Sequence, residues 1–350
     1  MSILIYGATG YTGKLVVEQA VLKGLKPIVA GRSESKVKSL AATYDLEYKV
    51  FSLDNVPKIV DAISGVKVLL NCAGPFIHTA KHLIEACLLT QTHYLDITGE
   101  IEVFEMAKEF DLQAKDNEII VLPGVGFDVV PTDCMANFLK EKLPEATHLE
   151  LAFMGLGGAM SHGTMATMVE SLGKGGAVRK DGKIENVPVG HEGKEIHFGM
   201  KKNWAMTIPW GDISTAYTST GIDNIEVYSA VSKTTYNLLK AQLLINPILQ
   251  NSWVKGMIKE YVDENFSGPT PEQNKKGIAL VYGKATNHRM EDTVELRFKT
   301  PETYLLTAKL AVLISQKVLE LKETYGYFTP AQLFGPKLIF EIEGVEWLDQ

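Results

Sequence analysis

Apolar and polar positions alternate along the first 125 residues in a pattern that predicts strands and helices in turn. Short apolar runs are each followed by segments in which apolar residues recur every three or four positions. The runs predict buried strands and the recurring segments predict amphipathic helices. The expected strands cover residues 2–6, 26–30, 47–51, 66–70, 93–96 and 118–122. Six strands alternating with helices predict an α/β fold with a parallel, doubly wound sheet.

Beyond a helix expected over 130–143, the pattern changes to longer alternating segments. These predict strands with one solvent-exposed face at 147–153 and 224–231. They also predict a hairpin formed by 279–285 and 293–298. Glycines at 155–158 predict a flexible turn. Ser161 is placed to cap a helix that ends near residue 172. These segments predict a second, α+β part with a mixed sheet. A long amphipathic helix over 304–321 and a closing strand near 338–342 follow it.

Composition and charge narrow the class of protein. Hydrophobic residues make up 45% and charged residues 22% of the 350, as in ordinary globular proteins. The net charge of −7 and the lack of a basic run argue against a nucleic-acid partner. Three scattered cysteines predict neither a disulfide framework nor a metal site, and they indicate a reducing, cytoplasmic setting.

No stretch approaches 18 uninterrupted apolar residues, and the N-terminus leads directly into a strand. We therefore expect neither a transmembrane helix nor a cleavable leader. The segment 238–262 is rich in Leu, Ile and Trp and is broken by Pro247. It predicts a pair of core or interface helices, and a membrane-surface or acyl-binding role is the alternative.

The first strand is followed by Gly7-Ala8-Thr9-Gly10-Tyr11-Thr12-Gly13 and then by a helical pattern. A strand, a glycine turn and a helix form the context that a dinucleotide-binding fingerprint requires. Gly7 allows a tight turn, Gly10 lets the backbone approach a pyrophosphate, and Gly13 lets the helix pack close to the sheet. We expect this Rossmann-type turn to contact a cofactor through Gly7, Thr9, Gly10, Tyr11, Thr12 and Gly13.

The second strand ends in Gly31-Arg32-Ser33, where NAD sites carry an acidic residue for the ribose 2′-hydroxyl. The first carboxylate here is Glu34. A guanidinium can bind a phosphate in a bidentate fork. Arg32 and Ser33 therefore predict NADP, with NAD as the second option and a solvated loop arginine as the competing interpretation.

The carboxyl ends of parallel strands share one edge of a sheet because their crossovers are right-handed. The loop after the fourth strand should line the nicotinamide ribose, and the loop after the fifth should lie beside it. These loops predict further cofactor contacts at Asn71, Cys72, Ala73, Gly74, Pro75, Gly99 and Glu100.

Several motifs occur in an order and spacing that resemble the saccharopine dehydrogenase-like oxidoreductases, the group that includes trans-acting enoyl reductases. The motifs lie at 7–13, 30–33, 71–76, 96–100, 126–133, 161–164 and 329–331. The resemblance implies an N-terminal NAD(P)-binding domain and a C-terminal α/β domain. We expect the Rossmann domain at 1–130, a substrate or dimerisation domain at 131–302, and a helix and strand at 303–350 that return to the first domain.

Hydride transfer by a nicotinamide needs a proton donor or acceptor from the protein. The candidates are His162, at a helix start in the second domain, and Asp128, after the sixth strand. For Asp128, and equally for Asp96, a carboxylate that caps a neighbouring helix or loop is the competing interpretation. For His162, the competing interpretation is a packed or exposed histidine without a catalytic role.

The sequence thus predicts an NADP-dependent oxidoreductase that transfers a hydride to or from a small or acyl-type substrate bound between the two domains. The region 151–230 has few basic residues beyond Arg179, Lys201 and Lys202, which disfavours an amino-acid adduct with several carboxylates. A non-catalytic NADP-binding sensor or scaffold is the alternative. The sequence leaves open whether the protein forms a homodimer.

Overall fold

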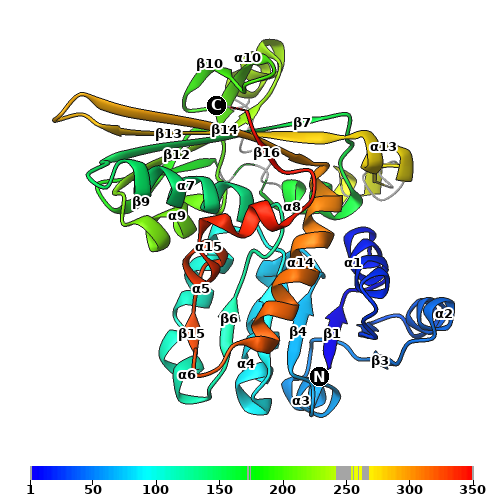
Figure 1. Ribbon diagram of the computed structural model, residues 1–350. Helices are drawn as coiled ribbons and strands as arrows, with labels where there is room; N and C mark the ends of the chain where they lie inside the picture. Colours follow the sequence, from blue (N-terminus) through cyan, green and yellow to red (C-terminus); the bar gives the residue numbers. More distant parts are fainter. Residues whose placement is uncertain are drawn as a thin grey trace. The chain divides into compact units, whose positions relative to one another are not determined.

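The computed structural model describes residues 2–348 except 172, 174, 242–253, 255, 259 and 262–267. Its contacts separate the chain into two units (Figure 1). Unit 1 comprises Met1–Asp128 and Tyr304–Leu333, and unit 2 comprises Val129–Thr303 and Phe334–Gln350. The expected division differs at the C-terminus, because residues 334–350 group with unit 2 rather than with the Rossmann domain.

Unit 1 is built on a seven-stranded sheet with the order β15-β6-β5-β4-β1-β2-β3. Every pair of neighbouring strands is parallel. The predicted doubly wound sheet is therefore confirmed, and the chain steps outward from β1 in both directions. Ligands of such folds bind outside the carboxyl ends of the strands at this switch point, between β1 and β4. The strands are β1 Ile3–Tyr6, β2 Ile28–Gly31, β3 Tyr48–Val50, β4 Val68–Asn71, β5 His93–Asp96, β6 Ile120–Leu122 and β15 Gly326–Tyr327.

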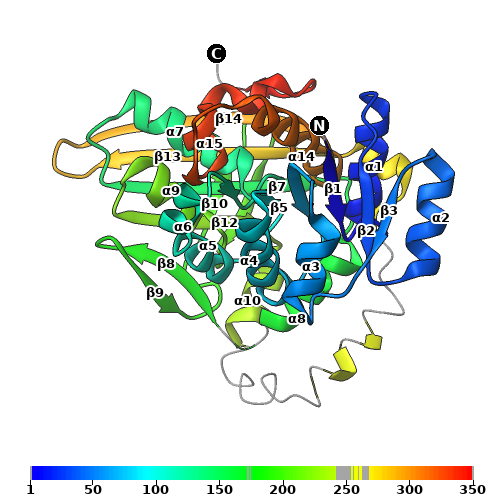
Figure 2. The same cartoon turned by 90° about the horizontal axis from the view of Figure 1, so that it is seen from below.

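Helices cover both faces of this sheet, as a parallel sheet with buried strands requires. Figure 2 shows α3 and α4 on one face and α14 on the other. The segment between β5 and β6 holds two helices, α5 and α6, which are separated at residues 109–110. The helices are α1 Tyr11–Leu22, α2 Glu34–Tyr44, α3 Val56–Ile63, η1 Phe76–His78, α4 Ala80–Thr90, α5 Ile101–Lys108, α6 Asp111–Asp116, α14 Thr303–Glu320 and α15 Pro330–Phe334.

Unit 2 has a mixed sheet with the order β10-β11-β12-β7-β13-β14-β16, and a β8–β9 hairpin pairs with β12. Strands β12 and β7 are parallel, and β13 pairs antiparallel with both β7 and β14. The expected mixed sheet and its hairpin are confirmed. The strands are β7 His148–Leu156, β8 Gly176–Lys180, β9 Lys183–Val187, β10 Gly193–His197, β11 Lys202–Thr207, β12 Asn224–Ala230, β13 Ile278–Asn287, β14 Asp292–Pro301 and β16 Glu346–Trp347.

Helix α7 packs directly on the sheet of unit 2. A Cβ atom at Gly283 of β13 would lie 2.4 Å from the Cγ atom of Met135, so this glycine allows the close approach. The helices of the unit are α7 Val130–Lys142, α8 His162–Ser171, α9 Asp212–Thr220, α10 Lys233–Ala241, α13 Pro271–Lys276 and η3 Pro336–Glu341.

Two sequence predictions for unit 2 are wrong. The turn expected from Gly155 begins later, because Gly155 pairs with Ala279 inside the sheet and β7 continues to Leu156. The closing strand expected near 338–342 is instead the 3-10 helix η3, which follows Gly335-Pro336 and buries Leu338 and Ile339. The segment 238–262 lies largely outside the described residues.

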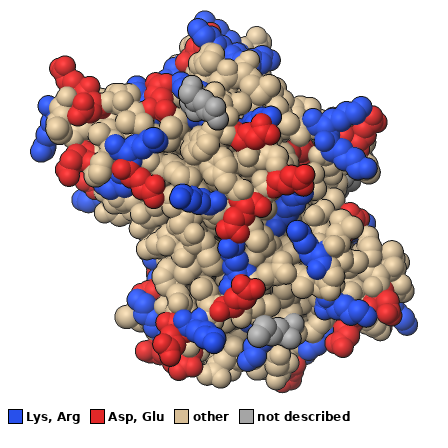
Figure 3. Space-filling view, in the orientation of Figure 1, with Lys and Arg blue, Asp and Glu red and all other residues tan. Residues whose placement is uncertain are grey.

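Charges of both signs are interspersed over the face of the molecule that Figure 3 shows. The expected lack of a nucleic-acid partner stays a prediction. In the described part of the chain, no helix combines the length and the apolar character needed to cross a membrane.

Candidate functional site

The three glycines of the β1–α1 turn differ in what surrounds them. Gly7 has φ +76°, and a Cβ atom there would lie 2.8 Å from the Ala73 nitrogen of the loop after β4. At Gly13, a Cβ atom would lie 2.2 Å from the Gly7 carbonyl oxygen. Gly10 is exposed, and its Cβ position meets only that same oxygen, at 3.3 Å. Gly7 and Gly13 therefore allow the tight packing of the turn, whereas the backbone at Gly10 is exposed and has free space beside it.

Helix α1 begins at this open backbone. Its N-cap residue, Gly10, supplies no side-chain cap, and the first turn has no acidic residue. The first N–H groups of a helix need acceptors and attract anions. Space and polarity at the turn thus fit a pyrophosphate. Thr9, Tyr11 and Thr12 flank the position, and Thr9 Oγ1 lies 4.0 Å from the Cβ position of Gly31.

Arg32 and Ser33 follow the carboxyl end of β2. Arg32 is exposed and makes no ion pair with any described residue, and Ser33 is the N-cap residue of α2. Burial raises the pKa of the Tyr6 hydroxyl to about 12, and the positive charge of Arg32 opposes that rise. The guanidinium therefore lies close enough to Tyr6 to act on it electrostatically, beside the first strand of the sheet.

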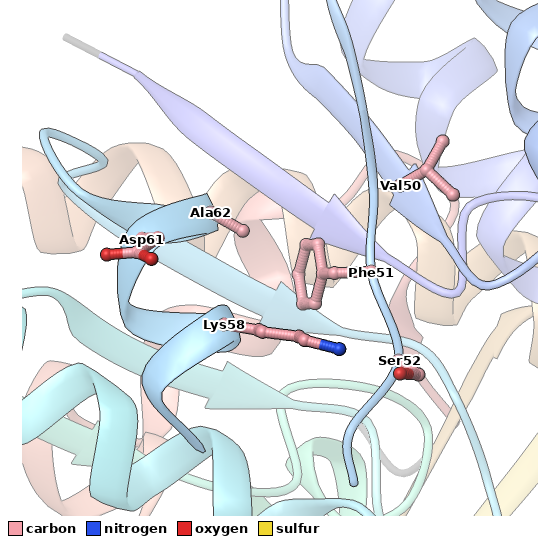
Figure 4. Close-up of a pocket in the computed structure, with 6 residues that line it drawn as sticks. All are labelled: Val50, Phe51, Ser52, Lys58, Asp61 and Ala62. Atoms are coloured by element: carbon pink, nitrogen blue, oxygen red, sulfur yellow. The ribbon is translucent and has the colours of Figure 1, made fainter. Parts of the chain in front are cut away.

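A hollow of about 510 Å³ opens beside the loop after β3 (Figure 4). Phe51 and Ser52 border it from the loop, and Lys58 borders it from α3. Its other lining residues are Val50, Asp61 and Ala62. Phe51 and Ser52 directly follow β3, so the hollow lies at the carboxyl end of that strand. In the sheet, β3 is two strands from β1, on the same side as β2 and Arg32.

Asn71 holds the loop after β4 in place. Its side chain is fully buried; Oδ1 accepts from the Ala73 nitrogen at 2.9 Å, and Nδ2 donates to Thr79 Oγ1 at 3.0 Å. Thr79 Oγ1 in turn donates to the Ala73 carbonyl at 2.8 Å. The backbone around Ala73 and Gly74 is therefore fixed against the Gly7 turn. Burial raises the pKa of the Cys72 thiol, which disfavours a thiolate nucleophile.

Glu100 binds the next turn of the same loop. Its carboxylate accepts from the backbone nitrogens of Phe76 and Ile77, both at 2.8 Å, and so caps η1. Burial raises the pKa of Glu100, while these two hydrogen bonds and the charge of the exposed His78 lower it. Glu100 thus stabilises the loop after β4 at the predicted cofactor site. Its neighbour His78 was not among the residues predicted from the sequence.

Asp96 is a structural carboxylate. It is fully buried and accepts from the Tyr94 hydroxyl at 2.7 Å and from the backbone nitrogens of Thr98 and Gly124 at 3.0 and 2.9 Å. Burial raises its pKa to about 6 against these three hydrogen bonds. Its own carbonyl accepts from the Val125 nitrogen at 2.8 Å. Asp96 therefore ties the exit of β5 to the loop that follows β6.

Asp128 ends that loop and differs from Asp96 in its surroundings. Its half-buried carboxyl packs on Gly99, where a Cβ atom would lie 2.9 Å from Oδ2. Among the residues that the structure describes, no donor hydrogen-bonds to it, and burial alone raises its pKa to about 7. A carboxyl kept partly neutral at neutral pH can both donate and accept a proton. Of the two carboxylates, only Asp128 has the properties of an acid–base group.

Helix α14 supplies two residues that sequence reasoning missed. Thr307 Oγ1 accepts from the Phe127 nitrogen at 3.0 Å, across 180 residues of sequence. The Tyr304 ring meets the Tyr11 ring edge-on, with centroids 5.2 Å apart. Both residues lie far from the motifs in the sequence, and no local spacing marks them.

His162 lies in unit 2, where it is the first residue of α8. The predicted cap of this helix is present, since the Thr164 nitrogen donates to Ser161 Oγ at 3.2 Å. The side chain of His162 lies outside the described residues. The loops of unit 1 thus gather at one sheet edge every candidate cofactor residue together with Asp128, and the assignment of His162 stays a prediction.

Comparisons with known proteins agree with this geometry. Residues 3–122 match the family model of the saccharopine dehydrogenase NADP binding domain. A lipid droplet localized protein of Caenorhabditis elegans is 29% identical over 205 residues, which cover 51% of this chain and 48% of that protein. A trans-acting enoyl reductase of Mycobacterium leprae is 31% identical over 141 residues, which cover 37% of this chain and 33% of that one. The matches thus span about half or less of the relatives' length.

Among solved structures, the apo saccharopine dehydrogenase (L-Glu forming) of Saccharomyces cerevisiae has the same fold. Its TM-score is 0.68 at 10% identity, and the match covers 99% of this chain and 98% of that one. The matched residues 3–122 contain the glycine turn, Arg32 and the loops after β4 and β5. The predicted resemblance is confirmed: residues 3–122 match the NADP binding domain of saccharopine dehydrogenase.

Proposed function

We propose that the chain is an NADP-dependent oxidoreductase in which Asp128 donates or accepts the proton that accompanies hydride transfer. The observation that carries this proposal is the Asp128 carboxyl at the carboxyl edge of the sheet, to which no described donor hydrogen-bonds and whose pKa burial raises to about 7. General acid–base groups work best when their pKa lies near the operating pH.

The cofactor would be held by the residues that surround the switch point. The first turn of α1 would bind the pyrophosphate, and Arg32 with Ser33 would bind the 2′-phosphate. The loop fixed by Asn71 and Glu100 would line the nicotinamide ribose. NADP, when bound, supplies or accepts the hydride.

The protein's own contribution is to place a proton near that chemistry. Asp96 fixes the backbone at Gly124 and Val125, and Gly99 leaves room for the Asp128 carboxyl. Because no hydrogen bond in the described residues holds this carboxyl, its proton is available to a substrate oxygen or carbon. His162 remains the second candidate for this role.

We propose an uncharged, acyl-type substrate. The names of the relatives, a trans-acting enoyl reductase and a lipid droplet localized protein, support a compound with a fatty chain. Binding of this small molecule between the two domains, and the lack of a nucleic-acid partner, remain predictions from the sequence.

An NADPH-consumption assay tests the function. We expect oxidation of NADPH with at least one α,β-unsaturated acyl thioester in a panel of chain lengths, and none with saccharopine-type precursors, an aldehyde plus glutamate. Turnover of the latter alone would overturn the substrate class. Tight NADPH binding without consumption across the whole panel would favour the sensor or scaffold function instead.

We expect NADPH to bind at least about tenfold more tightly than NADH, which corresponds to about 1.4 kcal/mol from a charge-assisted contact to the 2′-phosphate. Arg32→Ala should abolish this difference in affinity, because the variant lacks the exposed guanidinium that would bind the 2′-phosphate. Calorimetric titration of both cofactors measures it. The matched control is Lys38→Ala, an exposed cation on the next helix, which should leave the preference unchanged. Equal affinities in the wild type would refute the assignment of Arg32.

A further inference from the structure

Two residues connect the first turns of α14 to two parts of the candidate site, the loop after β6 and the start of α1. Thr307 binds the Phe127 nitrogen, and Gly126 accommodates it, since a Cβ atom there would lie 2.7 Å from Thr307 Cγ2. One turn earlier, the Tyr304 ring contacts Tyr11 with an interplanar angle of 84°. Figure 1 shows the beginning of α14 beside α1. The helix therefore links the loop after β6 to the phosphate-binding turn.

The strand order tells which half of the cofactor Tyr304 would face. Arg32 follows β2 on one side of β1, whereas β4, β5 and β6 lie on the other side. A dinucleotide spans the switch point, so its adenosine half lies toward Arg32 and its nicotinamide half toward β4. Tyr304 approaches Tyr11 on a helix held at the exit of β6, and thus from the nicotinamide side.

We propose that Tyr304 is a positioning residue for the nicotinamide half of NADP. With Tyr11 it forms an aromatic wall at the start of α1, and edge-to-face contact holds each ring in one orientation. Both rings are half-buried, so part of each is left for the cofactor to cover. The inference rests on the NADP site proposed above and adds to it the C-terminal helix, whose residues after 303 belong to unit 1.

Two ligands separate the two halves of the site. NADPH carries the nicotinamide, whereas adenosine 2′,5′-bisphosphate carries only the adenosine half with its 2′-phosphate. In calorimetric titrations, Tyr304→Ala and Tyr304→Leu should weaken NADPH about three- to tenfold, as expected for loss of one aromatic contact. Both variants should bind the bisphosphate as the wild type does, which also shows that they are folded.

Bound NADPH gives a second measurement. Its fluorescence should rise on binding to the wild type and to Tyr304→Phe, which keeps the ring, and should rise less with Tyr304→Ala. Tyr325→Ala is the matched control, because this half-buried tyrosine follows the opposite end of α14. It should change neither ligand's affinity.

Several outcomes would overturn the inference. Unchanged NADPH affinity in both Tyr304→Ala and Tyr304→Leu would show that the ring does not contact the cofactor. Equal weakening of both ligands would show that Tyr304 supports only the phosphate-binding turn. If the wild type bound neither ligand, the NADP site itself would be wrong, which is a different failure from either of these.

Discussion

Replacing Asp128 by asparagine should lower turnover roughly a hundred- to ten-thousand-fold, the usual contribution of a general acid–base group. Asparagine has nearly the same shape but cannot exchange a proton at neutral pH. Since no described residue hydrogen-bonds to the Asp128 carboxyl, the change should not disturb a structural bond. Steady-state NADPH consumption with the best substrate of the panel measures the loss, and calorimetry should show unchanged NADPH affinity.

The pH dependence identifies the group. A carboxyl with a pKa of about 7 is protonated below that value, so the reductive rate should fall as the pH rises through about 7. Asp128→Asn should lose this limb, whereas His162→Gln should keep it. If the limb survived in Asp128→Asn and vanished in His162→Gln, the proton donor would be His162.

The same raised pKa predicts how stability changes, which serves as the control without any substrate. The folded protein holds the Asp128 proton up to about pH 7, whereas an unfolded chain releases it near pH 4. Stability is therefore lost as the pH rises between these values, and the loss is complete above the folded pKa. Asp128→Asn should remove this loss and raise the free energy of unfolding above pH 7 by about 1–3 kcal/mol, allowing for partial solvent screening. No gain would mean that burial does not perturb Asp128.

The sheet of unit 1 could be predicted from the sequence because each strand, turn and helix is a local pattern. The six predicted strands are all present. Strand β15 was missed because it has only two residues and its partner β6 lies about 200 residues earlier. Such pairing is fixed by tertiary contacts rather than by local periodicity.

Unit 2 was less predictable for the same reason. Gly155 suggested a turn, but its pairing with Ala279 keeps it in β7, and nothing lies within 4 Å of its Cβ position. Strands β10 and β11 and helix α9 were not predicted at all. Antiparallel pairs between distant segments depend on which partner is available, and that information is not local.

The residues of the candidate site also differ in whether local sequence or tertiary contacts reveal them. The glycine turn and Arg32 follow from motif spacing. The sequence could not separate Asp96 from Asp128, because both are aspartates after neighbouring strands. Three hydrogen bonds make Asp96 a structural anchor, whereas no described donor hydrogen-bonds to Asp128, which is why we propose Asp128 as the acid–base group. Tyr304 lies nearly 300 residues from Tyr11, so only the folded chain brings the two rings together.

The glycines of the phosphate turn should respond to substitution in opposite ways. Gly10 is exposed and has φ −71° and ψ 169°, an extended conformation that valine also adopts. Its Cβ position meets only the Gly7 carbonyl oxygen, at 3.3 Å. Gly10→Val should therefore fold, but its side chain would occupy the space open to the pyrophosphate. Loss of one or two N–H bonds to phosphate, each worth about 1.5–3 kcal/mol, should weaken NADPH binding by about tenfold to ten-thousandfold.

Gly13→Ala is the matched comparison. Its Cβ atom would lie 2.2 Å from the Gly7 carbonyl oxygen and 2.9 Å from the Ala8 Cα atom. Because both neighbours are backbone, relief requires α1 to move from β1, and overpacking of this kind costs about 1–3 kcal/mol or more. Thermal unfolding followed by circular dichroism should show a lowered midpoint for Gly13→Ala and a nearly unchanged one for Gly10→Val, while calorimetry shows loss of NADPH in Gly10→Val. Retention of NADPH by a folded Gly10→Val protein would place the pyrophosphate elsewhere and would remove the basis for every cofactor contact assigned to this turn.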